Sequence, residues 1–127
     1  MSYPTELKYT EDHEWVSPAV DGICTIGVTS FAIEQLTDIV HIEFPDVGDE
    51  FAAGDSIGTI ESTKTVSDLY LPIAGKIVAT NEDLLEKCDT FQESPHDKAW
   101  IVKVSMSSDN LGDLMDAAAY KKFTEES

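Results

Sequence analysis

Residues that favour turns interrupt this chain about every ten positions, and this spacing constrains the fold more than any other feature. The interruptions are glycine, proline, aspartate and asparagine, and short apolar runs lie between them. In residues 39–44 apolar and polar residues alternate, which predicts a half-buried strand with Val40, Ile42 and Phe44 on one face. Similar runs predict strands at residues 22–28, 56–61, 66–71, 76–80 and 100–106. Short strands at this spacing predict a mainly β fold, a sandwich or barrel of antiparallel strands.

Three segments carry helical patterns instead. Residues 30–36 predict two helical turns, and Asn81 is a suitable cap for a short helix that carries Leu84, Leu85 and Cys88. The clearest pattern is at the C-terminus, where apolar residues recur at helical spacing, at Leu111, Leu114, Met115, Tyr120 and Phe123. No long linker interrupts the chain, so residues 1–127 are predicted to form a single domain with a helical C-terminal appendage.

Lys64 lies between two similar halves of the central sequence. Residues 38–62 and 66–80 both read as strand–turn–strand units, and each has a proline and a glycine near its outer end. Folding the two units about the segment from Ser62 to Thr65 predicts a tight hairpin with Lys64 at its tip. A lysine in this position has a rigid backbone and an exposed side chain that other proteins can reach.

The charge balance excludes two classes of partner. The chain has 25 acidic and 8 basic residues, for a net charge of −17, and every basic residue is a lysine. A protein without arginine lacks the planar guanidinium group that donates two parallel hydrogen bonds to a phosphate or to the edge of a guanine. The sequence therefore argues against nucleic acid and against anionic membrane surfaces, and favours partners with basic patches.

Neither the terminus nor the cysteines suggest export. No run approaches the ~18 apolar residues of a membrane span, and residues 1–8 have no signal- or transit-peptide pattern. Cys24 and Cys88 are far apart in sequence, which favours two reduced thiols in a reducing compartment. The predicted location is the cytoplasm.

The sequence motifs give little support for a catalytic function. His13, His41 and His96 occur singly, without the spacing of a metal site, and His41 with Glu43 reads as a solvated pair on a strand. There is no nucleophile elbow, phosphate loop or dinucleotide fingerprint, so we predict neither catalytic residues nor a metal.

Lys64 is the one residue whose context suggests chemistry. Glu61 precedes it and Asp68 follows it, and acidic neighbours favour the protonated amine over a Schiff-base nucleophile. A lysine that another enzyme acylates fits better, because the modified side chain would become a long neutral tether.

Motifs along nearly the whole chain resemble those of the H proteins of the glycine cleavage system, a family of lipoyl carriers. The most specific are His13-Glu14-Trp15 and the Glu-Ser-x-Lys-x-x-Ser-Asp pattern of residues 61–68. The other matching segments are residues 8–12, 16, 26–29, 35–40, 43–45, 47–48, 72–78, 81 and 100–104. A biotin carrier would show methionines beside the lysine, and lipoyl domains of 2-oxoacid dehydrogenases usually have aspartate directly before it.

The resemblance implies a flattened β-barrel of two sheets, of the lipoyl/biotinyl-carrier type, with short helices. It implies lipoic acid in amide linkage to Lys64, within a hairpin motif that includes Glu61, Ser62 and Ser67. The chain would be a non-catalytic carrier that shuttles an aminomethyl group and reducing equivalents. Its implied partners are the pyridoxal-phosphate-dependent glycine decarboxylase, the aminomethyltransferase, dihydrolipoyl dehydrogenase and a lipoyl-attaching enzyme.

The resemblance also implies a surface cleft that shelters the loaded arm. By position, Glu14 and Asp68 are the candidates to meet the charged amine there, with Asp12 as a third. A carboxylate that faces a cationic amine away from bulk water makes a charge-assisted contact. The alternative is that these residues are only turn or surface acids.

Two other functions stay open at this point. Thr63 and Thr65 flank the lysine where the family commonly has small apolar residues, and residues 95–100 lack the usual glycines. An H-like paralogue that acts as a lipoyl relay or redox-responsive lipoyl carrier is therefore one alternative. The other is an acidic β-sandwich binding protein without lipoylation, whose Lys64 is merely exposed.

Overall fold

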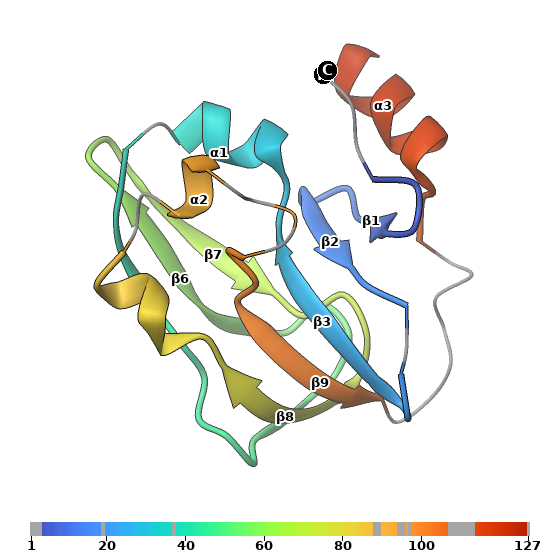
Figure 1. Ribbon diagram of the computed structural model, residues 1–127, viewed down its shortest axis with the longest axis vertical. Coiled ribbons are helices and arrows are strands. Elements are labelled where there is room, and N and C mark those ends of the chain that lie inside the picture. The colour runs from blue at the N-terminus through green and yellow to red at the C-terminus, as the bar shows by residue number, and fades with distance from the viewer. Residues whose placement is uncertain are drawn as a thin grey trace.

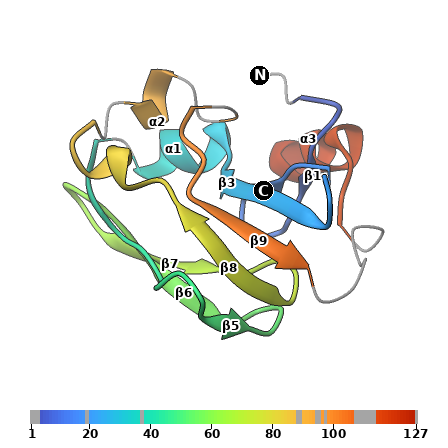
Figure 2. The ribbon, with the colours of Figure 1, turned by 60° about the horizontal axis from the view of Figure 1, so that its bottom comes forward.

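Antiparallel strands form two sheets that face each other across the core (Figures 1 and 2). The computed structural model describes residues 4–18, 20–36, 38–87, 90–93, 96, 98–106 and 114–126. Within them the larger sheet has the order β1-β2-β3-β9-β8-β5 and the smaller has the order β4-β6-β7. The strands of the larger sheet are β1 (Lys8–Tyr9), β2 (Glu14–Val16), β3 (Ile23–Val28), β9 (Val102–Met106), β8 (Gly75–Thr80) and β5 (Glu50–Phe51). Those of the smaller sheet are β4 (Ile39–Glu43), β6 (Ser56–Ser62) and β7 (Val66–Tyr70).

Apolar side chains from both sheets form the main core. The smaller sheet supplies Ile42, Ile60 and Leu69, and the larger sheet supplies Cys24, Ile26, Val28, Ile77, Val102 and Val104. All of them are buried, and each large apolar side chain contributes roughly 1.5–3 kcal/mol by leaving water. The mainly β sandwich predicted from the sequence is confirmed.

Four short helices accompany the two sheets. They are α1 (Ser30–Leu36), a 3₁₀ helix η1 (Glu82–Leu85), α2 (Thr90–Glu93) and α3 (Ala117–Glu126) within the described residues. The Thr29 hydroxyl caps α1 by accepting a hydrogen bond from the Ala32 N–H at 3.3 Å. No helix in the described part of the chain is long and apolar enough to cross a membrane.

A second, smaller cluster attaches α3 to the edge of the larger sheet. It consists of Leu7, Tyr9, Trp15 and Tyr120, with Phe31 and Phe123 packed against it. Figure 1 shows α3 beside β1 and β2, on the side away from β8. The backbone of Tyr9 also exchanges two hydrogen bonds with Met115, at 2.8 and 2.9 Å. The C-terminal helix therefore docks on the segment that leads into β2.

Gly27 allows the Trp15 ring to lie against β3. A Cβ atom at Gly27 would lie 2.6 Å from two carbons of the Trp15 ring, closer than real Cβ contacts occur. Trp15 pairs with Gly27 in the register of β2 and β3. This close approach fixes the position of β2, and with it the neighbouring Glu14.

Two predictions about strand faces and helix limits were wrong. Val40 does not share a face with Ile42, because a bulge between Ile39 and His41 turns it outward, where it is 47% exposed. The C-terminal helix begins at Ala117 rather than near Leu111, since Met115 is held in a β-bridge to Tyr9. Leu111 itself lies outside the described residues.

The segment after β8 also differs from its prediction in one respect. A short helix does follow Asn81, but the Asn81 side chain makes no capping hydrogen bond. Its amide donates instead to the backbone carbonyls of Lys98 and Trp100, at 3.1 and 2.9 Å. Asn81 therefore ties η1 to the segment before β9, and Cys88 lies outside the described residues.

Candidate functional site

Lys64 projects from a hairpin turn that one serine hydroxyl organises. The Ser62 N–H donates to the Thr65 carbonyl oxygen at 2.8 Å, closing the turn between β6 and β7. The buried Ser62 hydroxyl accepts from the N–H groups of Lys64 and Thr65 at 3.2 and 3.1 Å. The Thr63 N–H donates to the Asp38 carbonyl oxygen at 3.1 Å. The predicted hairpin is confirmed: its backbone is tied at several points, while the Lys64 side chain is exposed.

Glu61 and its cross-strand neighbours lie on the outer face of the smaller sheet. Glu61 pairs with His41 on β4 and with Val66 on β7. Val66 is 57% exposed, and His41 and Glu43 are exposed as predicted for a solvated pair. The base of the hairpin therefore presents both acidic and apolar side chains to solvent.

An acidic hollow lies beside the inner end of this hairpin. Its volume is about 170 Å³, and its polar lining consists of Asp12, His13, Glu14, Gln35, Ser67 and Asp68. The structure thus brings the three acids of the expected cleft together with Ser67. Lys64, Glu61 and Ser62 do not line it. Asp68 lies four residues from Lys64, a separation of at most roughly 14 Å along the chain.

Glu14 is neither a turn acid nor a surface acid, since it is only 3% exposed. Its Oε2 accepts a hydrogen bond from the Tyr70 N–H at 2.8 Å, while Oε1 is buried with no hydrogen-bond partner in the described part of the chain. Burial raises the pKa of Glu14 from 4.5 to about 8. The Tyr70 N–H opposes this rise, the charge of Asp12 adds to it, and the Thr10 hydroxyl opposes it to a smaller extent. Glu14 therefore holds a proton near neutral pH unless a cation is placed beside it.

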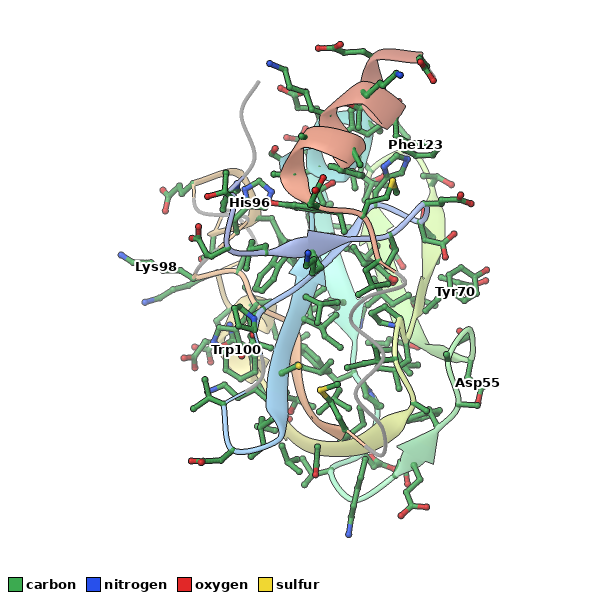
Figure 3. All side chains as sticks on the ribbon, turned by 90° about the vertical axis from the view of Figure 1, so that its right-hand side faces the viewer. Asp55, Tyr70, His96, Lys98, Trp100 and Phe123 are labelled. Atoms are coloured by element: carbon green, nitrogen blue, oxygen red, sulfur yellow. The ribbon has the colours of Figure 1, made fainter. Side chains whose placement is uncertain are left out.

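Asp68, in contrast, is exposed at the rim of the hollow. It lies on β7 opposite Thr59, and its Oδ2 accepts a weak hydrogen bond from the Tyr70 hydroxyl at 3.4 Å. The Tyr70 ring projects away from the core (Figure 3), so only its backbone reaches Glu14. The hollow therefore combines a buried, protonated acid with an acid in contact with water.

A second hollow is also lined by residues of this turn. Its volume is about 310 Å³, and Asp12 and Glu14 line it together with Tyr9, Gly54 and Met115, among others. Asp12 and Glu14 therefore border both hollows.

Comparison with known proteins identifies the family. A sequence model described as "Glycine cleavage H-protein" matches residues 7–127. A glycine cleavage system H protein of Staphylococcus haemolyticus is 48% identical over 99% of this chain and 100% of its own length. One from Carboxydothermus hydrogenoformans is 47% identical over 97% and 95%. The crystal structure of a glycine cleavage system H protein from Mycobacterium marinum superimposes with a TM-score of 0.89 at 37% identity, covering 97% of this chain and 99% of that one.

This chain belongs to the glycine cleavage H-protein family. Membership confirms the resemblance drawn from the motifs, and it agrees with the two-sheet fold. It supports the role of a lipoyl carrier in glycine cleavage and favours neither alternative, the lipoyl relay nor the unmodified binding protein.

His13 lines the hollow, a role that the sequence did not predict for it. All three histidines were predicted to occur singly, without the spacing of a metal site, yet His13 lies in the hollow beside Asp12 and Glu14. Its position between two candidate acids in a family motif was the available signal. His96 instead accepts a hydrogen bond from the Ser30 N–H at 3.2 Å. No group of metal-ligating residues occurs in the part of the chain that the structure describes.

Proposed function

We propose that this member of the H-protein family carries lipoic acid on Lys64 and serves glycine cleavage without catalysing a reaction itself. The observation that carries the proposal is an exposed lysine on a tightly tied hairpin, within reach of an acidic hollow. When bound, lipoic acid supplies a redox-active disulfide and a sulfur atom on which a one-carbon amine can travel. The chain's own residues attach, orient and shelter this group.

The hairpin residues have the attachment role. Ser62 holds the turn, and the exposed Lys64 side chain is accessible to a lipoyl-attaching enzyme. Glu61 and Ser67 flank the turn on paired strands, where they present a fixed pattern around the lysine. The tight backbone keeps the tether's origin fixed while the arm itself can swing.

The hollow fits a cationic amine at the end of such an arm. Glu14 offers a buried oxygen without a hydrogen-bond partner in the described residues, and a charge-assisted bond from an ammonium group would satisfy it. Asp68 at the rim and Asp12 on the turn add negative charge from two further directions. Shelter from bulk water would protect a carried group that water can release.

The partners follow from membership of the glycine cleavage system. We propose the decarboxylase, the aminomethyltransferase and dihydrolipoyl dehydrogenase, together with a lipoyl-attaching enzyme. The net charge of −17 supports docking to basic patches, and attraction of this kind speeds encounter while allowing release.

Intact-mass measurement tests the attachment. The chain is expressed with a lipoyl ligase and lipoate, alongside Lys64→Arg and the matched control Lys76→Arg, which changes another exposed lysine. We expect the wild type and Lys76→Arg to gain the mass of one lipoyl group, and Lys64→Arg to gain none. A wild-type chain without the added mass, or a gain that survives in Lys64→Arg, would refute the proposal.

Exchange of bicarbonate with the carboxyl group of glycine tests the role in glycine cleavage. The lipoylated chain is mixed with glycine decarboxylase, labelled bicarbonate and glycine, and label in glycine is followed over time. We expect exchange that depends on the modified chain. A modified chain that supports no exchange would favour the lipoyl-relay alternative.

A further inference from the structure

One hydroxyl group connects the C-terminal helix to the acidic turn. Tyr120 of α3 is fully buried, and its ring stacks on Tyr9 with centroids 4.7 Å apart. Its Oη lies 2.7 Å from the Nδ1 of His13 and 2.7 Å from the Oγ1 of Thr29. A helix more than 100 residues away in sequence thus contacts the residue between Asp12 and Glu14.

These three groups can form one directed chain of hydrogen bonds, because each hydroxyl can donate one hydrogen and still accept another. The Thr29 Oγ1 already accepts a hydrogen bond from the Ala32 N–H as the cap of α1. An assignment that uses both hydroxyl hydrogens has Thr29 donating to the Tyr120 Oη, and Tyr120 donating to the His13 Nδ1. Burial lowers the pKa of His13, which agrees with a neutral ring that accepts at Nδ1.

The turn that carries His13 needs such support. His13 has a φ of 64°, in the left-handed region that residues other than glycine rarely adopt. A conformation of this kind persists where surrounding contacts determine it. The backbone contributes a hydrogen bond from the Thr29 N–H to the His13 carbonyl oxygen at 2.9 Å. The His13 ring contributes contacts with Phe31 and Phe123, at centroid distances of 4.6 and 5.8 Å.

Within the turn, Thr10 links the acids to His13. Its hydroxyl accepts from the N–H groups of Asp12 and Glu14, each at 3.2 Å, and its carbonyl oxygen accepts from the His13 N–H at 3.1 Å. Rotation of His13 out of its left-handed conformation would therefore move both acids. It would also pull the Glu14 carboxyl away from the Tyr70 N–H.

We propose that Tyr120, acting through His13, is a positioning residue that holds Asp12 and Glu14 in place around the hollow. The C-terminal helix is then part of the machinery that shelters the loaded arm, although it does not line the hollow. This inference rests on the proposed function for its purpose, but the link between Tyr120 and the turn can be measured in the unmodified chain.

The first measurement compares Tyr120→Phe with Tyr9→Phe by nuclear magnetic resonance of the unmodified chain. Both variants keep a stacked aromatic pair and lose one buried hydroxyl. The Tyr9 hydroxyl, however, donates to the Pro4 carbonyl oxygen at 2.6 Å rather than to the turn. In Tyr120→Phe we expect the His13 pKa to rise, its ring tautomers to mix, and the amide signals of Asp12 and Glu14 to move. In Tyr9→Phe these signals should stay near their wild-type positions.

The second measurement follows retention of the carried group on the lipoylated chain in isolation. Each variant is loaded, separated from the loading enzyme and assayed over time for release of ammonia. We expect Tyr120→Phe to lose its load about fivefold faster, the fold-change that corresponds to one net hydrogen bond. Tyr9→Phe should match the wild type.

The outcomes separate this inference from the proposed function. Intact mass is measured first, and a bare Lys64 would refute the proposed function while leaving the resonance comparison of the turn intact. An unchanged His13 tautomer in Tyr120→Phe, or equal retention in Tyr120→Phe and Tyr9→Phe, would overturn the positioning role. If Tyr120→Phe fails to fold, His13→Asn replaces it, because asparagine tolerates the left-handed region. That variant should also lose its load about fivefold faster, and wild-type retention would refute the inference.

Discussion

Replacement of the buried Glu14 by glutamine should change how the stability of the protein depends on pH. Glutamine is close in shape to a protonated glutamate and can still accept the Tyr70 N–H bond, but it cannot ionise. In the wild type the pKa of Glu14 is about 8 in the folded chain, against an ordinary value of 4.5. Because the folded chain holds this proton more tightly than the unfolded chain, its stabilising contribution is complete below pH 4.5. It is lost progressively as the pH rises toward 8.

The size of the effect follows from the two pKa values. Each unit of difference corresponds to about 1.36 kcal/mol, and Glu14 is only 3% exposed, so solvent screening reduces it little. The Glu14 contribution to the free energy of unfolding should therefore fall by roughly 2–3 kcal/mol between pH 5 and pH 7. Glu14→Gln has no such titration. Its free energy of unfolding, relative to that of the wild type, should therefore rise by the same amount between pH 5 and pH 7.

Urea unfolding at pH 5, 6, 7 and 8 measures the difference between the two proteins. At each pH, the free energy of unfolding of the wild type is subtracted from that of Glu14→Gln, which removes the contribution of the other acids. A constant difference between a carboxyl and an amide does not change with pH and so does not affect the trend. Asp68→Asn, which changes an exposed acid at the rim of the same hollow, shows whether the effect requires burial. A difference between wild type and Glu14→Gln that stays constant across this pH range would refute the reasoning. It would mean that Glu14 is solvated or already paired in the folded chain.

Three further predictions concern the hairpin, the sheet edge and the partners. Ser62→Ala should lower the free energy of unfolding by about 1 kcal/mol and slow lipoylation of Lys64, as followed by urea unfolding and a mass time course. Gly27→Ala should destabilise the fold by about 1–3 kcal/mol, because the new Cβ would lie 2.6 Å from the Trp15 ring; unfolding monitored by tryptophan fluorescence measures this. Raising the ionic strength should weaken docking to the partner enzymes. Dissociation constants from calorimetry at several salt concentrations test this, and salt-independent values would contradict it.

Local pattern was sufficient to predict most strands and the hairpin. Alternating residues such as Cys24, Ile26 and Val28 are buried on one face, as a period of two requires. The bulge in β4 was missed because an extra residue between Ile39 and His41 reverses the alternation without any glycine or proline to mark it. The start of α3 was missed for a different reason. The spacing of Leu114 and Met115 is helical, but the backbone of Met115 pairs with Tyr9 of β1, which is distant in sequence.

The composition of the hollow could be anticipated only in part. The resemblance suggested Asp12, Glu14 and Asp68, and the structure places all three around one hollow. The burial of Glu14 could not be read from the three residues of β2. Alternation predicts one covered face, yet Trp15 is covered by the Tyr120 cluster while Val16 enters the main core. The Trp15 face is closed because α3 docks there, and the Glu14 face is closed by the smaller sheet, whose Tyr70 N–H donates to Glu14. No local pattern reports either long-range contact.

The contrast between Glu14 and the many exposed acids bears on how a carrier could hold a cation and still release it. Exposed carboxylates are solvated, so they attract any positively charged surface at long range and discriminate little between one cation and another. An ionised Glu14 in an empty hollow would be an unpaired buried charge, which is costly. It is therefore neutral near pH 7, and only a cationic group beside it favours its ionised form. On the proposed function, loading would release the Glu14 proton, and the hollow would prefer a charged amine to a neutral group of the same size.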